Sequence, residues 1–471
     1  MFNLKQFNAN LCLDGDGGTY SYAEVQHISE VMALAFDSRS LILCICENSV
    51  SSLLGYITFV THGHVPILID SGQISTIIQY IINQYKPDYV WMLESKISSI
   101  LGYKIVHSVG TYVLLKSVCK EAQSIPLNEN LQLLLTTSGS TGSNKFVRIS
   151  RNNLISNASS IKQYLSIDSQ DVAVTTLPYS YSFGLSIINS HLLAGASIQI
   201  TQLSPMSRDF WKLIEQKKVT SISGVPYTFQ MLKKIKFERF NLDSVRYLSQ
   251  AGGKLNQECL KYLIDISKGK NIPCFVMYGQ TEASPRMSYL PPENLDTKQG
   301  SIGIPIPGGR FEIIEEDGNI VSSAFKKGEL RYYGPNVAMG YSFELNDLSR
   351  GDEWNNILNT GDIAYRDDDG FYYIAGRLKR FVKLFGNRVS LDEVESFLHE
   401  TFVNCEFICF GSDDCLKIGY VGEVDVLNME QLLSRKLTVN KVAFKFQSLV
   451  EIPKLINGKV NFNYLNDLDT H

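Results

Sequence analysis

The chain has 471 residues, is 44% hydrophobic and 20% charged, and carries a formal net charge of -4 at pH 7. It is long enough for roughly two to four structural units, since a single hydrophobic core stops growing beyond about 250–300 residues. The weakly acidic balance gives no electrostatic reason to expect nucleic acid or an anionic membrane surface as a partner.

Targeting signals and cysteines suggest a reducing compartment. The N-terminal segment lacks a basic start followed by an apolar core, so no signal peptide is expected. No apolar run reaches about 18 residues without polar interruption, so no membrane span is expected. The nine cysteines are scattered, and Cys405, Cys409 and Cys415 lack the paired spacing of a zinc site. We therefore expect reduced core thiols in a cytoplasmic protein.

The order of the expected elements indicates an α/β fold. Helical periodicity covers residues 19–36, 49–63, 75–86, 152–165, 183–195, 210–218 and 228–235. Apolar runs of strand type cover residues 40–47, 65–70, 88–93, 171–178, 197–201 and 219–226. This alternation predicts βαβ units and a largely parallel sheet with helices on its faces.

The pattern changes near residue 300. Residues 309–319, 328–335 and 370–377 are short strand-like segments bounded by Gly, Pro and Asp, which predict a β-rich subdomain at about 300–376. The remaining residues mix helix and strand signals, typical of a small α+β domain. We therefore predict a large N-terminal domain of layered α/β subdomains over residues 1–378, followed by a small C-terminal domain over 379–471.

The stretch TTSGSTGSNK (136–145) predicts an anion-binding loop. Gly139 and Gly142 allow the positive φ angles with which successive N–H groups wrap an anion, and Lys145 adds a full charge. Further donors come from the hydroxyls of Ser138, Ser140 and Thr141. The Walker and dinucleotide patterns both fail here. A triphosphate is the natural ligand, and a Ser/Gly-rich surface turn is the alternative.

Four other segments carry groups suited to a nucleotide. The YGQTE segment (278–282) offers a hydroxyl and a carboxylate for a phosphate oxygen and Mg²⁺. Asp362 follows a turn and is able to accept hydrogen bonds from a ribose diol, and Arg377 begins the domain boundary. Lys459 follows a flexible glycine near the C-terminus. Taken singly, each residue also has a structural alternative. Tyr278 fits a core aromatic and Asp362 a turn former, while Arg377 fits a linker charge and Lys459 a solvated tail.

In their order and spacing, these motifs resemble the adenylate-forming superfamily, which includes acyl-CoA synthetases, firefly luciferase and peptide-synthetase adenylation domains. The resemblance spans nearly the whole chain, from TYSYAE (19–24) to Gly458-Lys459. Beside the loop and YGQTE, its motifs are LPYSYSFG (177–184), SGVP (223–226), AGGKL (251–255), GELRYYGPNVAMGY (328–341), NTGD (359–362) and GRLKRFVKLFGNRVSLDEVE (376–395).

The resemblance implies a two-step reaction and assigns residues to it. A carboxylic acid reacts with ATP and Mg²⁺ to give an acyl-adenylate and pyrophosphate, and the acyl group then passes to a thiol. Thr281 would contact the α-phosphate, Glu282 would bind Mg²⁺, and Lys459 would bridge the attacking carboxylate and the α-phosphate. The β- and γ-phosphates would contact Thr137, Ser138, Gly139, Ser140, Thr141, Gly142 and Lys145. The adenosine would contact Ala251, Gly252, Gly253, Tyr278, Asp362 and Arg377.

The same resemblance implies a hinge and an acyl pocket. The small domain would rotate about Lys379 between the two steps and bring the stretch with Gly386 to a thiol tunnel. The pocket would be lined by Tyr181, Ser223, Gly224, Gly252, Gly279, Ala283 and Ser284, mostly small or polar residues that favour a short or hydroxylated acid. Gly184-Leu185-Ser186 lacks the Asp that binds the α-ammonium in peptide-synthetase domains, which disfavours an α-amino acid. Arg286 fits either a substrate contact or a structural role.

Some positions depart from the superfamily pattern. Asn144 and Phe146 flank the loop lysine where Pro and Gly are usual, and Tyr181 stands where a histidine is frequent. We predict an acid–thiol ligase with ATP, Mg²⁺ and CoA as cofactors and a small carboxylic acid as substrate. One alternative acceptor is the phosphopantetheine of an acyl carrier protein. A non-catalytic nucleotide- or acyl-adenylate-binding protein is the other alternative, although such a protein has no need of Lys459.

Overall fold

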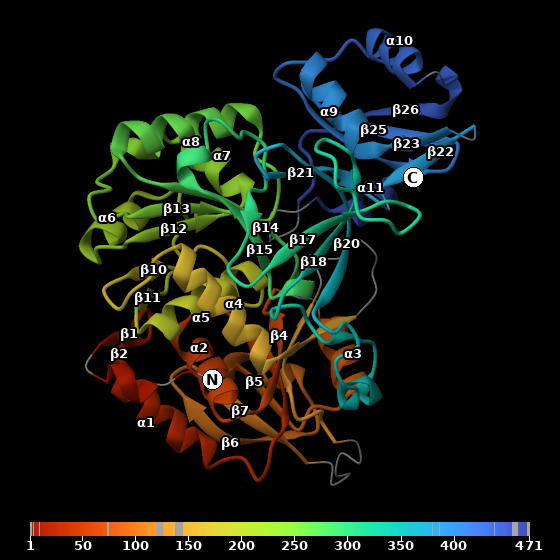
Figure 1. The fold of residues 1–471 in the computed structure, drawn as a ribbon. Coiled ribbons are helices and arrows are strands. Elements are labelled where there is room, and N and C mark those ends of the chain that lie inside the picture. Colours follow the sequence, from red (N-terminus) through yellow and green to blue (C-terminus); the bar gives the residue numbers. More distant parts are fainter. Residues whose placement is uncertain are drawn as a thin grey trace. The chain divides into compact units, whose positions relative to one another are not determined.

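The computed structural model describes residues 2, 4–8, 10–72, 75–118, 126–136, 145–378, 380–385, 387–437, 439–454 and 460–468. These residues form two compact units (Figure 1). The first contains the described residues up to 136, those of 145–310 and those of 333–358. The second contains residues 311–332 and the described residues from 359 onward. The predicted boundary after residue 378 stays a prediction, because Lys379 lies outside the described residues.

The first unit holds an eight-stranded sheet with the order β19-β9-β8-β4-β3-β5-β7-β6. Its strands are β3 (Leu41–Cys46), β4 (Val65–Asp70), β5 (Tyr89–Leu93), β6 (Tyr103–Val109), β7 (Tyr112–Ser117), β8 (Leu131–Thr136), β9 (Phe146–Ser150) and β19 (Gly340–Ser342). The four central strands are parallel, whereas pairing is antiparallel toward both edges. The parallel centre agrees with the predicted βαβ units, and the antiparallel edges were not foreseen.

A nine-stranded sheet with the order β16-β15-β14-β13-β12-β10-β11-β1-β2 completes the first unit. Its strands are β1 (Leu11–Gly15), β2 (Gly18–Ser21), β10 (Val172–Val174), β11 (Ser197–Gln199), β12 (Ser221–Gly224), β13 (Tyr247–Gln250), β14 (Cys274–Gly279), β15 (Arg286–Leu290) and β16 (Ile304–Pro305). Strands β14, β13, β12, β10, β11 and β1 run parallel. Their carboxyl ends therefore share one edge of the sheet, where open α/β sheets commonly bind ligands.

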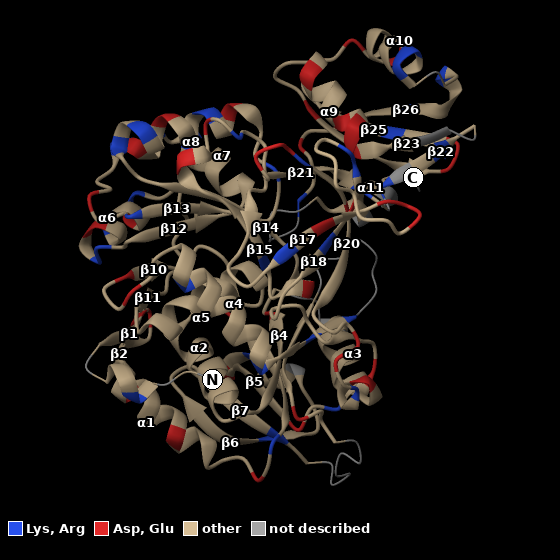
Figure 2. Cartoon of the chain, viewed as in Figure 1, with Lys and Arg blue, Asp and Glu red and all other residues tan. Residues whose placement is uncertain are grey.

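Helices fill the space around these sheets. They are α1 (Tyr22–Ala33), α2 (Val50–Thr61), α3 (Ser75–Tyr85), α4 (Arg151–Tyr164), α5 (Ser182–Ala194), α6 (Arg208–Gln216), α7 (Pro226–Lys234) and α8 (Gln257–Lys270). One hydrophobic cluster joins side chains of α2 and α5 to strands of both sheets. Of the helices within the described ranges, none is both long and apolar enough to cross a bilayer. Acidic and basic residues alternate on α8 (Figure 2), as is typical of a solvated face.

The first helix begins later than the sequence indicated. Residues from 19 were expected to be helical, but Gly18–Ser21 forms β2 and α1 begins at Tyr22. The Ser21 side chain accepts a hydrogen bond from the Glu24 N–H, and the Glu24 carboxylate accepts one from the Ser21 N–H. This reciprocal capping box satisfies two N–H groups and fixes the start of the helix. The S-x-x-E spacing was the signal that would have located it.

The second unit is built of smaller sheets. Four strands, β17 (Arg310–Ile314), β18 (Gly328–Tyr333), β20 (Ile357–Arg366) and β21 (Tyr372–Arg377), form one sheet within the segment expected to be β-rich. The others are the hairpin β22 (Phe381–Leu384)–β23 (Asn387–Ser390) and the sheet β24 (Glu406–Ser412), β25 (Cys415–Val421), β26 (Phe444–Ser448). Helices α9 (Leu391–Thr401) and α10 (Val426–Leu437) share a hydrophobic core with these strands, and α11 (Phe462–Asp467) is the last helix described.

Candidate active site

Three adjacent parallel strands of the nine-stranded sheet deliver the predicted adenine residues and most of the predicted acyl-pocket residues. Strand β12 ends at Gly224, β13 ends just before Ala251, and β14 ends at Gly279. In register, Gly224 lies beside Gln250, and Gln250 lies beside Val276. The segments that follow these strands therefore emerge at the same edge of the sheet, and the fold brings the predicted adenine and acyl residues of the first unit together.

Tyr181 and Gly252 are in close contact although 71 positions separate them. Tyr181 is the N-cap residue of α5 and is largely buried, and Gly252 has a φ of +88°. A Cβ atom on Gly252 would lie 2.8 Å from the Tyr181 hydroxyl oxygen. Glycine is therefore required here both for its backbone conformation and for space. The tyrosine found in place of a histidine packs directly on the backbone expected to line the nucleotide pocket.

The turn after β14 is held by polar contacts. Thr281 is buried, and its hydroxyl lies 3.0 Å from the hydroxyl of Ser182 at the start of α5. The Asn336 amide donates to the Ala283 and Arg286 carbonyl oxygens at 2.7 and 3.0 Å. Two buried oxygens near these strand ends, Gln250 Oε1 and Ser284 Oγ, have no hydrogen-bond partner among the described residues.

Glu282 and Lys145 meet on one aromatic side chain, Tyr341. The Tyr341 hydroxyl donates a 2.8 Å hydrogen bond to Glu282 Oε1, and Lys145 Nζ lies 3.8 Å from the centroid of the same ring. Burial and the neighbouring carboxylate raise the pKa of Tyr341 far above its ordinary value, so the phenol stays neutral and donates. Tyr341 ends the GELRYYGPNVAMGY motif, but the motif alone indicated no role for this residue.

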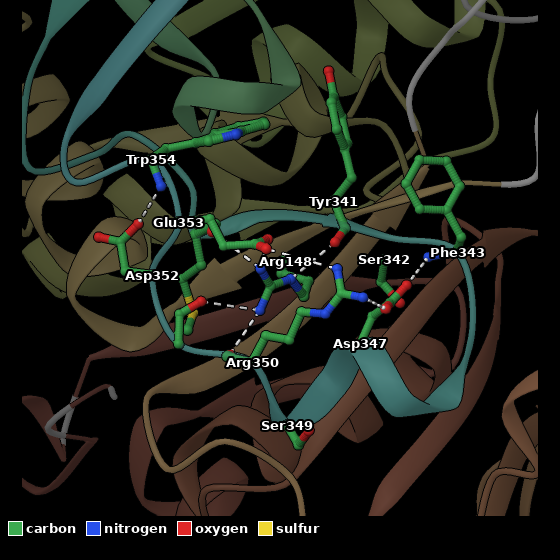
Figure 3. A network of polar contacts seen from close by, with 12 residues as sticks. Arg148, Tyr341, Ser342, Phe343, Asp347, Ser349, Arg350, Asp352, Glu353 and Trp354 are labelled. Atoms are coloured by element: carbon green, nitrogen blue, oxygen red, sulfur yellow. Dashed lines mark hydrogen bonds and ion pairs between the residues drawn. The ribbon is translucent and has the colours of Figure 1, made fainter.

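Arg148 fixes the strand that follows Lys145 to the segment that carries Tyr341 (Figure 3). Its side chain is fully buried, and β9 pairs with β19 so that Val147 lies beside Tyr341. The guanidinium forms an ion pair with Glu353. It also donates hydrogen bonds of 2.7–3.1 Å to the carbonyl oxygens of Met339, Tyr341, Arg350 and Gly351. The backbone on both sides of the Lys145–Tyr341 contact is therefore anchored by one cation.

The donor set fits a magnesium ion that arrives with its substrate. Among the described residues, no three His, Cys, Asp or Glu side chains are grouped as a metal site. Glu282 uses Oε1 to accept from Tyr341, which leaves Oε2 to face a cation. Mg²⁺ is commonly held by one or two carboxylates together with substrate phosphates and water. A single carboxylate beside a lysine is compatible with that mode.

In the second unit, the predicted ribose-binding residues are direct neighbours. Asp362 on β20 and Arg377 on β21 are register partners, and Arg377 Nε donates to Asp362 Oδ1 at 3.0 Å. The Asp362 side chain is only 2% exposed, whereas that of Arg377 is 59% exposed. The Arg377 backbone N–H also donates to Asp392 at the start of α9. This pair combines a fixed carboxylate with an accessible cation.

The remaining predicted site residues fall into two groups, those outside the described residues and those at the strand ends. Residues 137–142, Lys379, Gly386 and Lys459 lie outside the described residues. Tyr278 is half-buried at the end of β14, and the Gln280 amide donates to its hydroxyl at 3.4 Å. Ser223 is buried, with its hydroxyl 2.7 Å from that of Ser249. The structure therefore assembles the strand-end part of the predicted site in the first unit and the Asp362–Arg377 pair in the second.

Two mixed sheets with polar groups at their strand ends define an α/β protein with a candidate ligand site. A model of the family described as AMP-binding enzyme matches residues 3–342, and the chain therefore belongs to the AMP-binding enzyme family. The predicted family and the α/β fold class are confirmed, and family membership makes the chain an AMP-binding enzyme.

Curated relatives support this membership. The putative acyl-CoA synthetase YngI of Bacillus subtilis (strain 168) is 28% identical over 302 residues, which cover 62% of this chain and 54% of YngI. A 2-succinylbenzoate–CoA ligase of Bacillus cereus (strain Q1) is 28% identical over 344 residues, 70% of this chain and 69% of the relative. A long-chain-fatty-acid–CoA ligase of Escherichia coli O157:H7 is 30% identical over 357 residues, 72% of this chain and 62% of the relative.

Solved structures share the fold over almost the full length. The o-succinylbenzoate CoA synthetase MenE from Bacillus subtilis, in complex with the acyl-adenylate OSB-AMP, gives a TM-score of 0.78 at 21% identity and covers 99% of this chain and 98% of its own. ATP-bound MatB from Rhodopseudomonas palustris gives a TM-score of 0.77 at 21% identity and covers 98% of this chain and 95% of its own.

Proposed function

We propose that this chain joins a small carboxylic acid to the thiol of CoA at the expense of ATP. In the first step an oxygen of the carboxylate bonds to the α-phosphorus of ATP, the bond to the β-phosphate breaks, and pyrophosphate leaves. In the second step the thiol sulfur bonds to the acyl carbon, the acyl–oxygen bond breaks, and AMP leaves while the thiol loses its proton. Membership of the AMP-binding enzyme family and relatives named as CoA ligases support this reaction.

The observation that carries the proposal is the Glu282–Tyr341–Lys145 contact. It places a carboxylate and an ammonium group around one half-buried phenol. In ATP with Mg²⁺, the metal ion would be the partner of the carboxylate and a phosphate the partner of the ammonium group. Bound Mg²⁺ would offset the charge of the phosphates. Glu282 would hold that ion, Lys145 would contact the outer phosphates with residues 137–142, and Thr281 would contact the α-phosphate. Positioned charges of this kind supply most of the catalysis in phosphoryl-type displacements.

Residues of the second unit have proposed roles of their own. Asp362 and Arg377 would hold the ribose hydroxyls, and Lys459 would offset the charge that builds as two anions approach. The small domain over 379–471 would turn about Lys379 after adenylation, so that Gly386 faces the thiol. A hinge needs a residue whose backbone can change conformation at an element boundary. Replacing Lys379 with Pro should spare adenylation and slow thioester formation, and an equal loss of both would contradict the hinge.

The acid and the cellular setting are finer parts of the proposal. The relatives are named for different acids, so their names do not select one for this chain. Small residues at the strand ends support a short or hydroxylated acid rather than a long chain. The described cysteines are free thiols, which is compatible with the proposed cytoplasmic location.

Pyrophosphate exchange into ATP, measured with a panel of carboxylic acids, tests the first step. Thioester formation is then measured with CoA and, separately, with phosphopantetheinylated carrier proteins. We expect acid-dependent exchange and a thioester with CoA. A thioester formed only with a carrier protein would reassign the acceptor. Nucleotide binding without exchange for any acid would identify a non-catalytic binding protein and contradict the proposal.

A further inference from the structure

Arg286, the first residue of β15, is buried among neutral groups. Only 2% of the surface of Arg286 is exposed. Nε donates to the Ser186 hydroxyl at 3.1 Å, and Nη1 lies 3.1 Å from the Tyr164 hydroxyl and 2.8 Å from the Met277 sulfur. The ring of Phe183 lies 4.7 Å from the guanidinium carbon. No described residue accepts a hydrogen bond from Nη2 or forms an ion pair with this arginine.

Other arginines of this chain that leave water take a carboxylate with them. Among the described residues, the buried Arg148 is paired with Glu353, and the largely buried Arg380 with both Asp392 and Glu395. A buried charge without a counter-ion loses its hydration and gains no ion-pair attraction in return, which is unfavourable. Hydroxyl, thioether and ring contacts offset only a part of this cost. The surroundings of Arg286 therefore lack one anion.

Arg286 lies at the predicted acyl-binding residues. Phe183 and Met277, which it contacts, belong to an apolar cluster with Val225 and Ala251, and Tyr181 packs against that cluster. Burial raises the pKa of Tyr181 to about 12, while the charge of Arg286 acts in the opposite direction. Its charge therefore reaches the tyrosine that covers Gly252. A substrate that contacts Tyr181 comes within the field of a cation with a free donor.

On the basis of the proposed function, we propose that Arg286 binds a second carboxylate of the substrate, and that the enzyme activates short dicarboxylic acids. One carboxylate would react at the α-phosphate, and the other would supply the anion that the Arg286 environment lacks. The planar guanidinium suits this role, because it presents parallel N–H groups that match the two oxygens of a carboxylate. The small residues predicted for the acyl pocket are compatible with a short diacid.

Matched pairs of acids test the proposal. Pyrophosphate exchange is measured with succinate against butyrate and with glutarate against pentanoate, and monomethyl succinate serves as the diacid with its second charge removed. We expect kcat/KM to be about 10- to 100-fold higher for the diacid of each pair, because hydrogen bonds to charged groups contribute strongly. Equal or better use of the monoacids and the methyl ester by the wild-type enzyme would overturn the proposal. If none of the acids supported pyrophosphate exchange, that result would instead contradict the proposed function.

Substitution of the arginine tests its role. We expect Arg286→Gln to reduce the diacid-to-monoacid ratio of kcat/KM by about 10- to 100-fold, and Arg286→Lys to retain part of the preference. The ratio is measured on one sample, so partial unfolding does not change it. Arg208→Gln, at an exposed position of α6, is the control and should leave the ratio unchanged. A ratio unaltered in Arg286→Gln would show a structural role and overturn the proposal.

Discussion

The Tyr341 hydroxyl donates a 2.8 Å hydrogen bond to Glu282 Oε1, while the ring of the same tyrosine receives the Lys145 ammonium at 3.8 Å. Tyr341 therefore positions the proposed magnesium ligand and the last residue of the proposed phosphate loop together. The ring belongs to β19, which pairs with the strand that follows Lys145. The two charged groups are held within one connected part of the first unit.

Removing the Tyr341 hydroxyl tests this arrangement. Tyr341→Phe keeps the ring under Lys145 but leaves Glu282 Oε1 without its donor. Hydrogen bonds to charged groups contribute about 1.5–3 kcal/mol, so we expect the KM for Mg·ATP in pyrophosphate exchange to rise by about tenfold or more. Titration with Mg²⁺ at fixed ATP measures it. Tyr20→Phe, on a hairpin near the N-terminus, is the control. An unchanged Mg²⁺ dependence in Tyr341→Phe would contradict the positioning role.

Lys459 is the cation on which the first step should depend. We expect Lys459→Ala to lower acid-dependent pyrophosphate exchange by about 10²–10³-fold, because a preorganised charge aimed at the transition state is lost. The variant should still convert a preformed acyl-adenylate and CoA to the thioester, which high-performance chromatography of the product measures. Normal exchange in this variant would exclude the assignment, and loss of both steps would indicate a structural defect.

The Asp362–Arg377 pair can be tested with the nucleotide itself. If Asp362 accepts hydrogen bonds from the ribose hydroxyls, the wild-type enzyme should use ATP better than 2′-deoxy-ATP. Asp362→Asn should then raise the KM for ATP by about tenfold, since a charged acceptor becomes neutral. The same substitution should raise the KM for 2′-deoxy-ATP less. The preference for ATP over 2′-deoxy-ATP should therefore be smaller in Asp362→Asn than in the wild type. Equal effects on both nucleotides would place Asp362 outside the ribose contact.

Arg148 should be a stability determinant of the first unit. Arg148→Met leaves four carbonyl oxygens without their donor and removes the ion-pair partner of Glu353, whose side chain is 44% exposed. Each buried acceptor left unsatisfied typically costs about 1–3 kcal/mol. We expect a marked fall in the thermal unfolding midpoint, measured by calorimetry. Lys212→Ala is the control, because the side chains of Lys212 and its partner Asp209 are 67% and 69% exposed. Exposed pairs contribute less than about 1 kcal/mol. Similar effects of the two substitutions would contradict this ranking.

His191 on α5 should make the protein sensitive to acid. Burial lowers the pKa of His191 to about 4, its Nδ1 lies 2.8 Å from the Ile187 carbonyl oxygen, and its buried Nε2 has no partner among the described residues. Protonation would therefore create a buried charge and an unsatisfied N–H. The unfolded chain takes up this proton near pH 6.5 and the folded chain only near pH 4, so stability falls as the pH drops through that interval.

The His191 prediction is checked by thermal unfolding between pH 7 and pH 4. His191→Gln removes the titrating group, so its unfolding midpoint should decline less steeply than that of the wild type across this interval. Some decline should remain, because burial also lowers the pKa of His64 to about 4. His399→Gln, at an exposed position of α9, is the control. Parallel pH profiles for wild type and His191→Gln would rule out this contribution.

Local sequence patterns predicted much of the fold and the order of the site segments. The apolar run at 41–46 forms β3 as predicted. The run is continuously apolar because every one of its residues is buried. The AGGKL segment follows β13, and YGQTE covers the end of β14, the parallel strand beside it. The helix expected from residue 19 was misplaced by three residues, since the capping box at Ser21 outweighs the helical periodicity before it.

By itself, the sequence determined the family, the α/β class and the residue types that face a nucleotide, because these depend on local composition and on motif order. Tertiary structure decided which distant residues meet. Tyr341 bonds to Glu282 across 59 positions, and Arg148 joins carbonyl oxygens about 200 positions away. From the sequence, Arg286 fitted either a substrate contact or a structural role. The tertiary structure showed that it is buried without an ion-pair partner among the described residues, which favours the substrate contact. Burial and the partners of a charge arise only when strands from separate parts of the chain pack together, and no local pattern records them.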